Sequence, residues 1–518
     1  MSKFIVKTVD IVFIVLLGVV LLSMSIATAK YVNDGPMCLI LGMVIFCGTF
    51  VSLFLLRNQI KNFVKTLFNC ITNIPPWKLA LVLGLISAIT KLFFVFLFDM
   101  NTDMHEDMRM YRSFATQYAN SGYITENTDY ATWYKYTLMF GLILSPFAKI
   151  FGSDPKVFTS ALSIFVSVAI VLLFDIIKKY TGKEIAFIGL LGYILVPYGL
   201  FQTQVLIHEN MLLFFHIVAF WFYQKVFENK NNSVIRFVYL LLSGIFISLG
   251  KSINAAGQVI VISFGIYAAA KIFIDGFKVK KLLQFICIIL VLTICFVGAS
   301  ALTDIIYENT VEKSNLKSVN MKSLPYGWGI YLGYNYETNG VWNYEDQETY
   351  YEFRNFDTQE EANTYQKELI QNRLQEYFDS PYKFFVLFFN KLENLLAIPF
   401  IGATYNYGGP ANAFFCQGAN GLFFKGSLII TLLSFLYVYG ILFLEKVSNF
   451  KKKVQNVKPD THFQMVVIGV TTILLLIGEV SPKYSAHLHI LIFATALFSA
   501  KSYFINSVIY RNKKAFAN

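Results

Sequence analysis

Charged residues are scarce in this sequence, at 14% of 518 residues, whereas 56% are hydrophobic. Soluble globular domains carry about 25% charged residues, so this composition excludes that class. The six cysteines show no paired spacing, which argues against a disulfide framework. The chain also has no phosphate-binding glycine loop, no GxSxG turn and no HExxH pattern among its six histidines. Soluble nucleotide-driven chemistry is therefore not expected.

Long apolar runs recur along the chain and predict about twelve membrane-spanning helices. The first run ends at Ala27-Thr28-Ala29, which looks like a signal-peptide cleavage site, but its apolar core is too long for a cleaved signal. We therefore expect an uncleaved first helix and an all-α polytopic membrane protein. The predicted spans are 9–29, 36–56, 79–98, 157–177, 184–203, 210–227, 234–250, 255–272, 281–301, 426–444, 463–479 and 485–503.

Basic residues gather in loops on one side of this predicted topology, which places both termini in the cytoplasm. This requires the segments 133–151 and 384–400 to lie at the outer interface without crossing. The net charge of +11 then faces anionic membrane lipid, and nucleic acid is not needed as a partner. The basic residues are Arg57, Lys61, Lys65, Lys178, Lys179, Lys183, Lys225, Lys230, Arg236, Lys271, Lys278, Lys280, Lys281, Lys446, Lys451 to Lys453, Arg511, Lys513 and Lys514.

This topology divides the chain into four parts. Two additional N-terminal spans and a cytoplasmic loop (1–77) precede a transmembrane core (78–301), whose acidic first outer loop covers 99–135. An extracytoplasmic aromatic and acidic segment (302–424) and C-terminal spans (425–518) follow.

Carboxylates cluster where an apolar run ends, in the stretch Asp99 to Tyr111. In a helix, Asp103, Asp107 and Tyr111 share one face, with Glu106 beside them. Like charges so close together, partly desolvated, are expected to raise at least one pKa, as a general base requires. The cluster also suits a divalent cation, Mg²⁺ or Mn²⁺, so metal use stays open. The alternative is a solvated loop that ends a helix.

The outer segment 302–424 is rich in aromatic and acidic side chains, among them Trp328, Asn335, Trp342 and Asp346. Aromatic faces flanked by carboxylates and amides suit sugar rings, which offer apolar C–H faces and a fringe of hydroxyls. Plain anchoring at the membrane interface would have a similar composition.

Further ionisable residues fall at the predicted outer ends of spans. They are Glu209, Lys251, Glu479 and Lys483, the last followed by Tyr484. Ionisable groups at membrane depth are costly, which makes them functional candidates. An outward lysine suits a phosphate. The alternatives are helix capping, ordinary turns, and a lysine that reaches to lipid headgroups.

Several of these motifs occur together in one family. They are Asp103 to Tyr111, Tyr134 to Gly152, Glu209, the string Gly327-Trp328-Gly329-Ile330-Tyr331-Leu332-Gly333-Tyr334-Asn335, the string Asn339-Gly340-Val341-Trp342-Asn343-Tyr344-Glu345-Asp346, Ser380-Pro381, Glu479 and Lys483-Tyr484. From about residue 78 onward the chain resembles the bacterial integral-membrane glycosyltransferases of the GT-C class, which are related to protein O-mannosyltransferases and to the aminoarabinose transferase that modifies lipid A. The family more often has arginine at the Lys483 position and a proline shortly after, where this chain has Ser485, Ala486 and His487.

The resemblance implies a GT-C type helical bundle that transfers a sugar from a polyprenyl-phosphate donor to a cell-envelope acceptor on the outer membrane face. The acceptor would be a glycan, a teichoic acid, a lipid or a protein. Asp107, or otherwise Asp103, would be the base of an inverting reaction, and Lys251 and Lys483 would neutralise the leaving phosphate. The other substrate-binding candidates are Glu106, Tyr111, Glu209, Trp328, Asn335, Trp342, Asp346, Glu479 and Tyr484.

Many family members that move single sugars work without a metal, whereas the oligosaccharide-transferring branch binds one. Two alternative functions remain at this point. One is a transporter or flippase of lipid-linked sugars, and the other is a polysaccharide polymerase.

Overall fold

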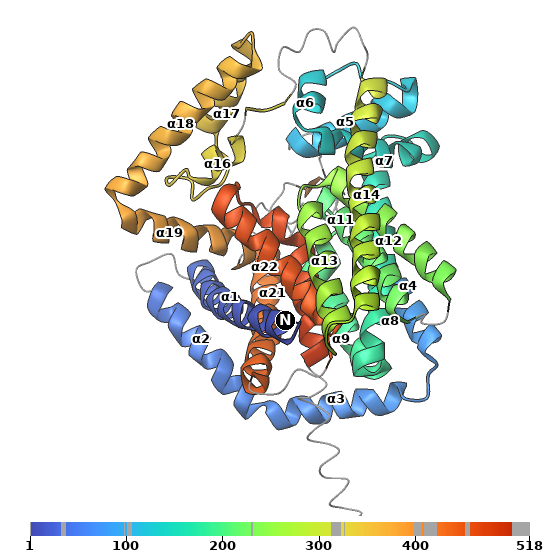
Figure 1. The fold of residues 1–518 in the computed structure, drawn as a ribbon. Helices are drawn as coiled ribbons and strands as arrows, with labels where there is room; N and C mark the ends of the chain where they lie inside the picture. The colour runs from blue at the N-terminus through green and yellow to red at the C-terminus, as the bar shows by residue number, and fades with distance from the viewer. Residues whose placement is uncertain are drawn as a thin grey trace, which may run out of the picture.

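The computed structural model describes residues 2–32, 38–97, 99–100, 106–228, 232–311, 323–325, 327–397, 407–408, 422–450 and 456–499. In these residues the chain is almost entirely helical (Figure 1). The first half contains α1 (Ser2–Val32), α2 (Cys38–Leu55), α3 (Arg57–Ile71), α4 (Pro76–Leu97), α5 (Glu106–Ser121), α6 (Thr128–Trp133), α7 (Lys135–Phe151), α8 (Pro155–Thr181), α9 (Lys183–Leu195), α10 (Pro197–Phe201), α11 (His208–Glu228) and α12 (Ser233–Ile253).

The second half contains α13 (Gly257–Phe273), α14 (Val279–Thr310), α16 (Trp328–Gly333), α17 (Tyr344–Glu352), α18 (Gln359–Asp379), α19 (Pro381–Leu392), α21 (Leu422–Asn449) and α22 (Pro459–Ile477). Short turns lie at Phe353–Asn355 (η2), Glu393–Ala397 (η3) and Pro482–Ser485 (η6), and a last helix covers 486–499. Two strands of two residues each, β1 (Asp99–Met100) and β2 (Tyr407–Gly408), pair antiparallel.

Eight of the described helices are long and apolar enough to cross a membrane, and two shorter apolar helices accompany them. These helices confirm a helical, multi-pass membrane protein, while the count of about twelve spans stays a prediction. The eight are Ser2–Lys30, Pro76–Leu97, Pro155–Thr181, His208–Glu228, Ser233–Ile253, Val279–Thr310, Gly426–Asn449 and Pro459–Ile477, and the shorter two are Ile40–Leu55 and Gly257–Phe273.

The predicted span 184–203 differs from the structure, because it is broken into α9 and α10. Val196 between them has an extended backbone, and Pro197 begins α10. Proline has no N–H and disfavours helical geometry in the residue before it, which explains the break. The two segments predicted to lie at the interface form α7, with 17 residues, and α19, with 12. Both are shorter than the roughly 20 residues that a span needs.

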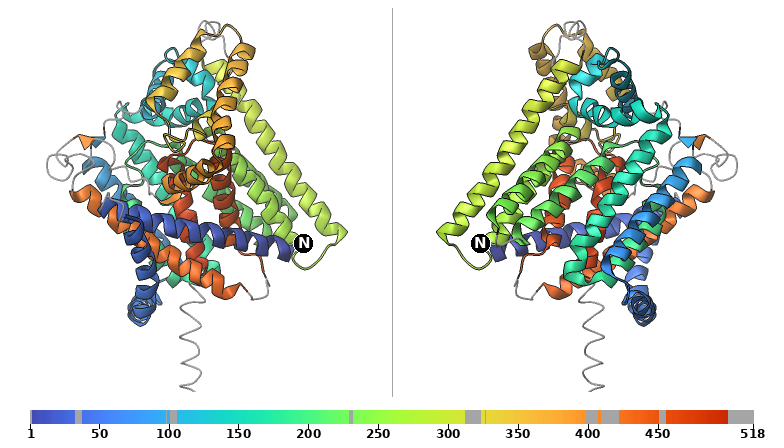
Figure 2. Two further views of the ribbon diagram at one scale, coloured as in Figure 1. Left: turned by 90° about the vertical axis from the view of Figure 1, so that its left-hand side faces the viewer. Right: turned by 90° about the vertical axis from the view of Figure 1, so that its right-hand side faces the viewer.

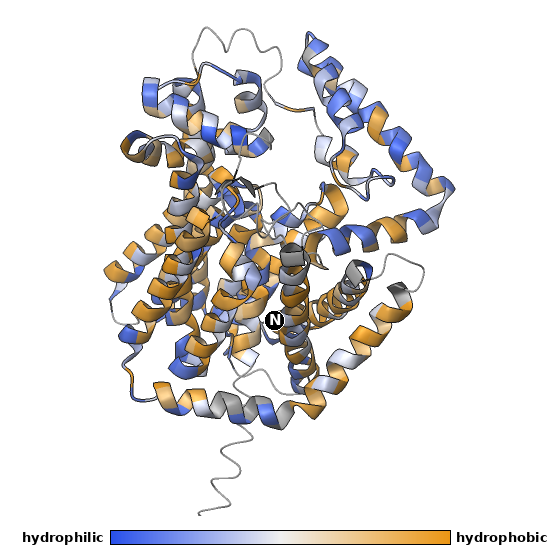
Figure 3. Ribbon diagram, turned by 180° about the vertical axis from the view of Figure 1, so that it is seen from behind, coloured by the Kyte–Doolittle hydropathy of each residue, from blue (hydrophilic) through white to orange (hydrophobic). Residues whose placement is uncertain are grey.

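The polar segments gather at one end of the molecule. Figure 1 shows α5, α6 and α16 to α18 at this end and α3 at the opposite end. In Figure 2 the long helix α14 connects the two ends. Figure 3 shows hydrophilic residues concentrated at the end that contains α5, α6 and α16 to α18, and apolar helices between the two ends. The first acidic loop contacts the end of α14 directly: the Ile124 N–H donates to the Thr310 carbonyl at 2.9 Å. Which side of the membrane this end faces stays a prediction; we refer to it as the polar end.

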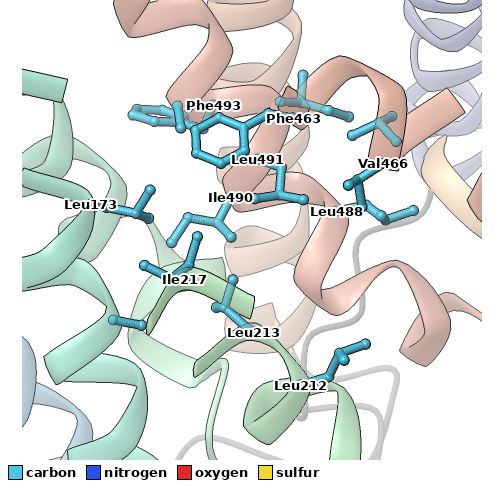
Figure 4. Packing of buried hydrophobic residues seen from close by; sticks show 14 of the residues in the cluster. Leu173, Leu212, Leu213, Ile217, Phe463, Val466, Leu488, Ile490, Leu491 and Phe493 are labelled. Atoms are coloured by element: carbon cyan, nitrogen blue, oxygen red, sulfur yellow. The ribbon is translucent and has the colours of Figure 1, made fainter. Parts of the chain in front are cut away.

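A buried apolar core holds α11, α22 and the last helix together. Figure 4 shows Ile217 of α11, Phe463 of α22 and Leu491 of the last helix among its members. All three side chains are fully buried. Close packing of this kind fixes helices relative to one another. It therefore fixes the start of α11 and the loop after α22, which both contribute to the cavity described next.

Candidate active site

A cavity of about 460 Å³ lies where the polar end meets the apolar helices. Its wall is built from α5, α7, α11, the α12–α13 turn, α16, α22 and the segment that follows α22. The polar lining residues are Asp107, Tyr111, Tyr136, His208, Glu209, Asn254, Gln258, Glu479, Lys483, Tyr484 and His487, and the others are Ala255, Ala256, Val259, Gly329, Val470, Ile473, Leu474, Ile477 and Gly478. Such a cavity, apolar on one side and polar on the other, suits an amphiphilic ligand.

Asp107 and Lys483 form an ion pair in this cavity, with Lys483 Nζ 2.5 Å from Asp107 Oδ2. The Tyr130 hydroxyl donates a hydrogen bond to the other carboxylate oxygen. The Asp107 side chain keeps 37% of its surface exposed, and that of Lys483 keeps 20%. The pair is therefore enclosed by protein yet open to the cavity.

This pairing changes the acidity expected for the carboxylate cluster. Burial raises the pKa of Asp107, but the charge of Lys483 and the hydrogen bonds from Lys483 and Tyr130 outweigh it and lower the pKa to about 2. The predicted upward shift is therefore wrong for Asp107, because sequence spacing did not reveal a cation 376 residues away. Asp103 lies outside the described residues, and so does the side chain of Glu106.

Glu479 is a carboxylic acid of the cavity that titrates near neutral pH. It lies in the loop between α22 and η6, on the same wall as Lys483. Desolvation raises its pKa to about 7, against the opposing effect of the Lys483 charge. Of these two groups, Asp107 is thus firmly ionised, whereas Glu479 gains its charge as the pH rises through neutrality.

Tyr111 and His208 close the cavity between α5 and α11. Tyr111 lies one helical turn after Asp107 in α5, so both side chains face the same wall. The Tyr111 hydroxyl and His208 Nδ1 are 2.9 Å apart, and the ring of Tyr136 stacks on His208 with centroids 5.6 Å apart. These contacts hold the first turn of α11 against α5 and α7.

Part of the segment 302–424 docks onto the loop that carries Glu479 and Lys483. A Cβ added to Gly333 would lie 2.3 Å from the Gly478 carbonyl oxygen, so only glycine permits this approach. The Val480 N–H donates to the Gly340 carbonyl at 2.9 Å. Lys391 of α19 donates to the carbonyls of Leu475 and Gly478, at 2.8 Å each, and so caps the end of α22.

Four of the predicted sugar-binding residues lie elsewhere in the outer segment. Trp328 and Trp342 pack against each other, with ring centroids 5.9 Å apart, in an aromatic cluster. Asp346 is fully buried and accepts from Arg373 at 2.9 Å and from Asn335 at 3.5 Å. None of the four lines the cavity. Their contacts give this small segment a core of its own.

Lys251 also turns away from the cavity. Its ammonium group donates to Ser300 and lies 4.2 Å from the centroid of the Phe296 ring, both on α14. Lys483 is accordingly the only lysine or arginine among the described residues that lines the cavity.

The structure also brings in polar residues that the sequence analysis did not select, namely Tyr136, His208, Asn254, Gln258 and His487. His208 had a usable signal, because it directly precedes Glu209. Tyr136 belongs to the family-like segment Tyr134 to Gly152. His487 was noted only as a departure from the family pattern. No spacing in the sequence pointed to Asn254.

No group of three or more His, Cys, Asp or Glu side chains in the described part of the chain is placed to hold a metal ion. Two of the carboxylates considered for such a site, Asp103 and Glu106, have no described side chains. Use of a divalent cation stays a prediction.

Comparison with known proteins gives one family match. Residues 135–299 match the family model described as dolichyl-phosphate-mannose-protein mannosyltransferase. This match confirms, over these residues, the resemblance to membrane glycosyltransferases predicted from the sequence. No curated protein matches the chain.

Among solved structures, the chain is similar to the archaeal oligosaccharyltransferase AglB from Archaeoglobus fulgidus, in complex with an inhibitory peptide and a dolichol-phosphate. The TM-score is 0.43 at 12% sequence identity, and the similarity covers 86% of this chain and 52% of that one. The chain thus spans about half the length of this oligosaccharyltransferase.

Proposed function

We propose that this protein transfers a sugar from a polyprenyl-phosphate carrier to a hydroxyl-bearing cell-envelope acceptor on the outer face of the membrane. The observation that carries the proposal is the Asp107–Lys483 pair, which lies in a cavity with both polar and apolar walls. A base and a phosphate-binding cation are the two groups that such a transfer needs. The family match over 135–299 supports the same class of reaction.

In this mechanism the donor phosphate replaces Asp107 as the partner of Lys483. The positive end of α13 also meets the cavity at Ala255 and Ala256, and favours an anion there. Once Lys483 contacts the phosphate, the largest influence that lowers the pKa of Asp107 weakens. The carboxylate then becomes a stronger base in the presence of donor.

Asp107 next accepts the proton of the acceptor hydroxyl. The acceptor oxygen attacks the anomeric carbon from the face opposite the phosphate, and the bond between that carbon and the phosphate oxygen breaks. The products are a glycosylated acceptor with inverted configuration and free polyprenyl phosphate, whose charge Lys483 balances. The apolar wall formed by Val470, Ile473 and Ile477 suits the first isoprenoid units of the carrier.

The test is release of the free carrier. Detergent-solubilised protein is incubated with a panel of polyprenyl-phosphate sugars and candidate cell-envelope acceptors, and free polyprenyl phosphate is measured together with glycosylated acceptor. We expect the two products to form in equal amounts. Movement of intact lipid-linked sugar between leaflets of vesicles, without carrier release across the panel, would replace this proposal by a flippase.

The same assay tests the metal. We expect carrier release to continue after a chelator is added. Complete loss of activity that Mg²⁺ or Mn²⁺ restores would establish that a cation is required.

A further inference from the structure

Two buried polar side chains in the cavity have no role in the mechanism above. They are Glu209, in the first turn of α11, and His487, near the start of the last helix. Glu209 is 0% exposed and His487 is 1% exposed. Within the described residues, neither carboxylate oxygen of Glu209 and neither ring nitrogen of His487 has a hydrogen-bond partner.

Leaving such groups without partners is costly. A buried donor or acceptor that has lost its hydrogen bonds to water and gained none in the protein destabilises the fold, and more so when it is charged. Proteins retain such groups when a ligand or ordered water completes their bonding. His208 Nδ1 lies 3.4 Å from Glu209 Oε2, but it lies only 2.9 Å from the Tyr111 hydroxyl. His208 is thus already engaged with Tyr111.

The arrangement of the cavity limits what the ligand group can be. Glu209 and His487 share the cavity with Lys483, where the donor phosphate binds in the proposed mechanism. The sugar attached to that phosphate would therefore lie in or next to the same cavity. A carboxylate accepts hydrogen bonds from hydroxyl groups, and a neutral imidazole both donates and accepts, so the two side chains together match adjacent hydroxyls.

We propose that Glu209 and His487 form the site that binds the hydroxyl groups of the transferred sugar. This inference rests on the proposed function. It adds a specificity-determining pair that is distinct from the base Asp107 and the phosphate ligand Lys483. Glu209 accepts hydrogen bonds from one or two sugar hydroxyls, and His487 bonds to a neighbouring hydroxyl.

The test compares binding of two probes, a polyprenyl-phosphate hexose and the sugar-free polyprenyl phosphate. The wild-type protein, purified in detergent, is expected to prefer the best hexose lipid of a small panel by roughly tenfold or more, since the sugar-free lipid cannot make the hydrogen bonds to Glu209 and His487. Glu209→Gln and His487→Phe should each reduce this preference to a few-fold. Neither should change the affinity for the sugar-free lipid. The matched control is Glu228→Gln, at the other end of α11, where Glu228 pairs with Lys179 at the surface.

Two further arms sharpen the result. A deoxy-hexose lipid that lacks the contacted hydroxyl should bind the wild type more weakly than the hexose lipid does. The variant that lacks the side chain for this hydroxyl should bind both lipids with the same affinity. His487→Gln, which keeps a hydrogen-bonding side chain, replaces His487→Phe if the latter does not fold, and it should retain an intermediate preference.

The inference is overturned if the wild type binds both lipids equally, or if Glu209→Gln and His487→Phe leave the preference intact. Equal loss of affinity for both lipids would also overturn it, by showing a structural role. Failure of the proposed function gives a different signature, because the sugar preference would persist while no free carrier is released.

Discussion

Replacing Asp107 by asparagine separates the two roles that we propose for the Asp107–Lys483 pair. The amide keeps the shape of the side chain and an oxygen that accepts from Tyr130, but it cannot take a proton from the acceptor. Loss of a general base reduces kcat by about 10²–10⁴-fold. This corresponds to about 3–5 kcal/mol on the activation barrier.

The same substitution frees Lys483 to bind phosphate. In the wild type a donor must separate Lys483 Nζ from a carboxylate oxygen 2.5 Å away. Because the two side chains are 37% and 20% exposed, solvent screens most of their attraction. A partly exposed pair that is open to water in the cavity is worth up to about 1 kcal/mol, so donor affinity should rise about fivefold.

The assay therefore measures kcat for carrier release and, separately, the Kd for the polyprenyl-phosphate sugar. We expect Asp107→Asn to lower both quantities, with folding and membrane insertion intact. Asp103→Asn should have a smaller effect. The control is Asp304→Asn, which breaks an exposed pair with Lys135 and should change neither quantity. Wild-type turnover in the purified Asp107→Asn protein would refute the assignment of the base, and unchanged donor affinity would refute the competition for Lys483.

Three further predictions concern the rest of the cavity and the topology. Since Glu479 is neutral below its pKa of about 7 and negative above it, donor affinity should fall as pH rises through that value, by roughly tenfold for a second negative charge near the phosphate. Titration calorimetry at several pH values should give a shallower profile for Glu479→Gln than for the wild type, and equal profiles for the two proteins would contradict the idea. Gly333→Ala should displace the Gly478 carbonyl and lower kcat by about tenfold or more, since a small displacement of active-site groups slows a reaction strongly. The control is Gly298→Ala, where an added Cβ meets nothing within 4 Å, and equal rates in the two variants would contradict the importance of the Gly333–Gly478 contact. Cys416 should react with an impermeant thiol reagent added to intact cells, whereas a cysteine placed at position 452 should react only after lysis. Labelling of the cysteine at position 452 in intact cells would refute the predicted orientation in the membrane.

The helical fold was largely predictable because the bilayer imposes strong constraints on sequence. A span must be long, apolar and internally hydrogen bonded, and such runs are visible in the sequence. The break at Pro197 was also visible, yet the apolar run around it looked continuous. Whether α7 and α19 cross the membrane depended on their length, which the apolar run alone did not define.

The sequence predicted which residues lie at the polar end wherever their position in the chain alone decides this. Asp107, Glu479 and Lys483 follow or precede apolar runs, and so all three fall at the polar end. The rotation of a helix about its axis is not visible in this way, and Lys251 faces α14 rather than the cavity for that reason. Asp346 is buried because the outer segment needs a polar core contact with Arg373. That requirement arises only once the segment folds.

The contact of Gly333 and Lys391 with the end of α22 links the segment 302–424 to the end of the cavity where Lys483 lies. Lys391 holds the Gly478 carbonyl, and Lys483 follows five residues later in the chain. A force applied to α16 or α19 is therefore transmitted through backbone contacts to the lysine that pairs with Asp107. A macromolecule that binds this segment would therefore change the position of Lys483 without entering the cavity itself.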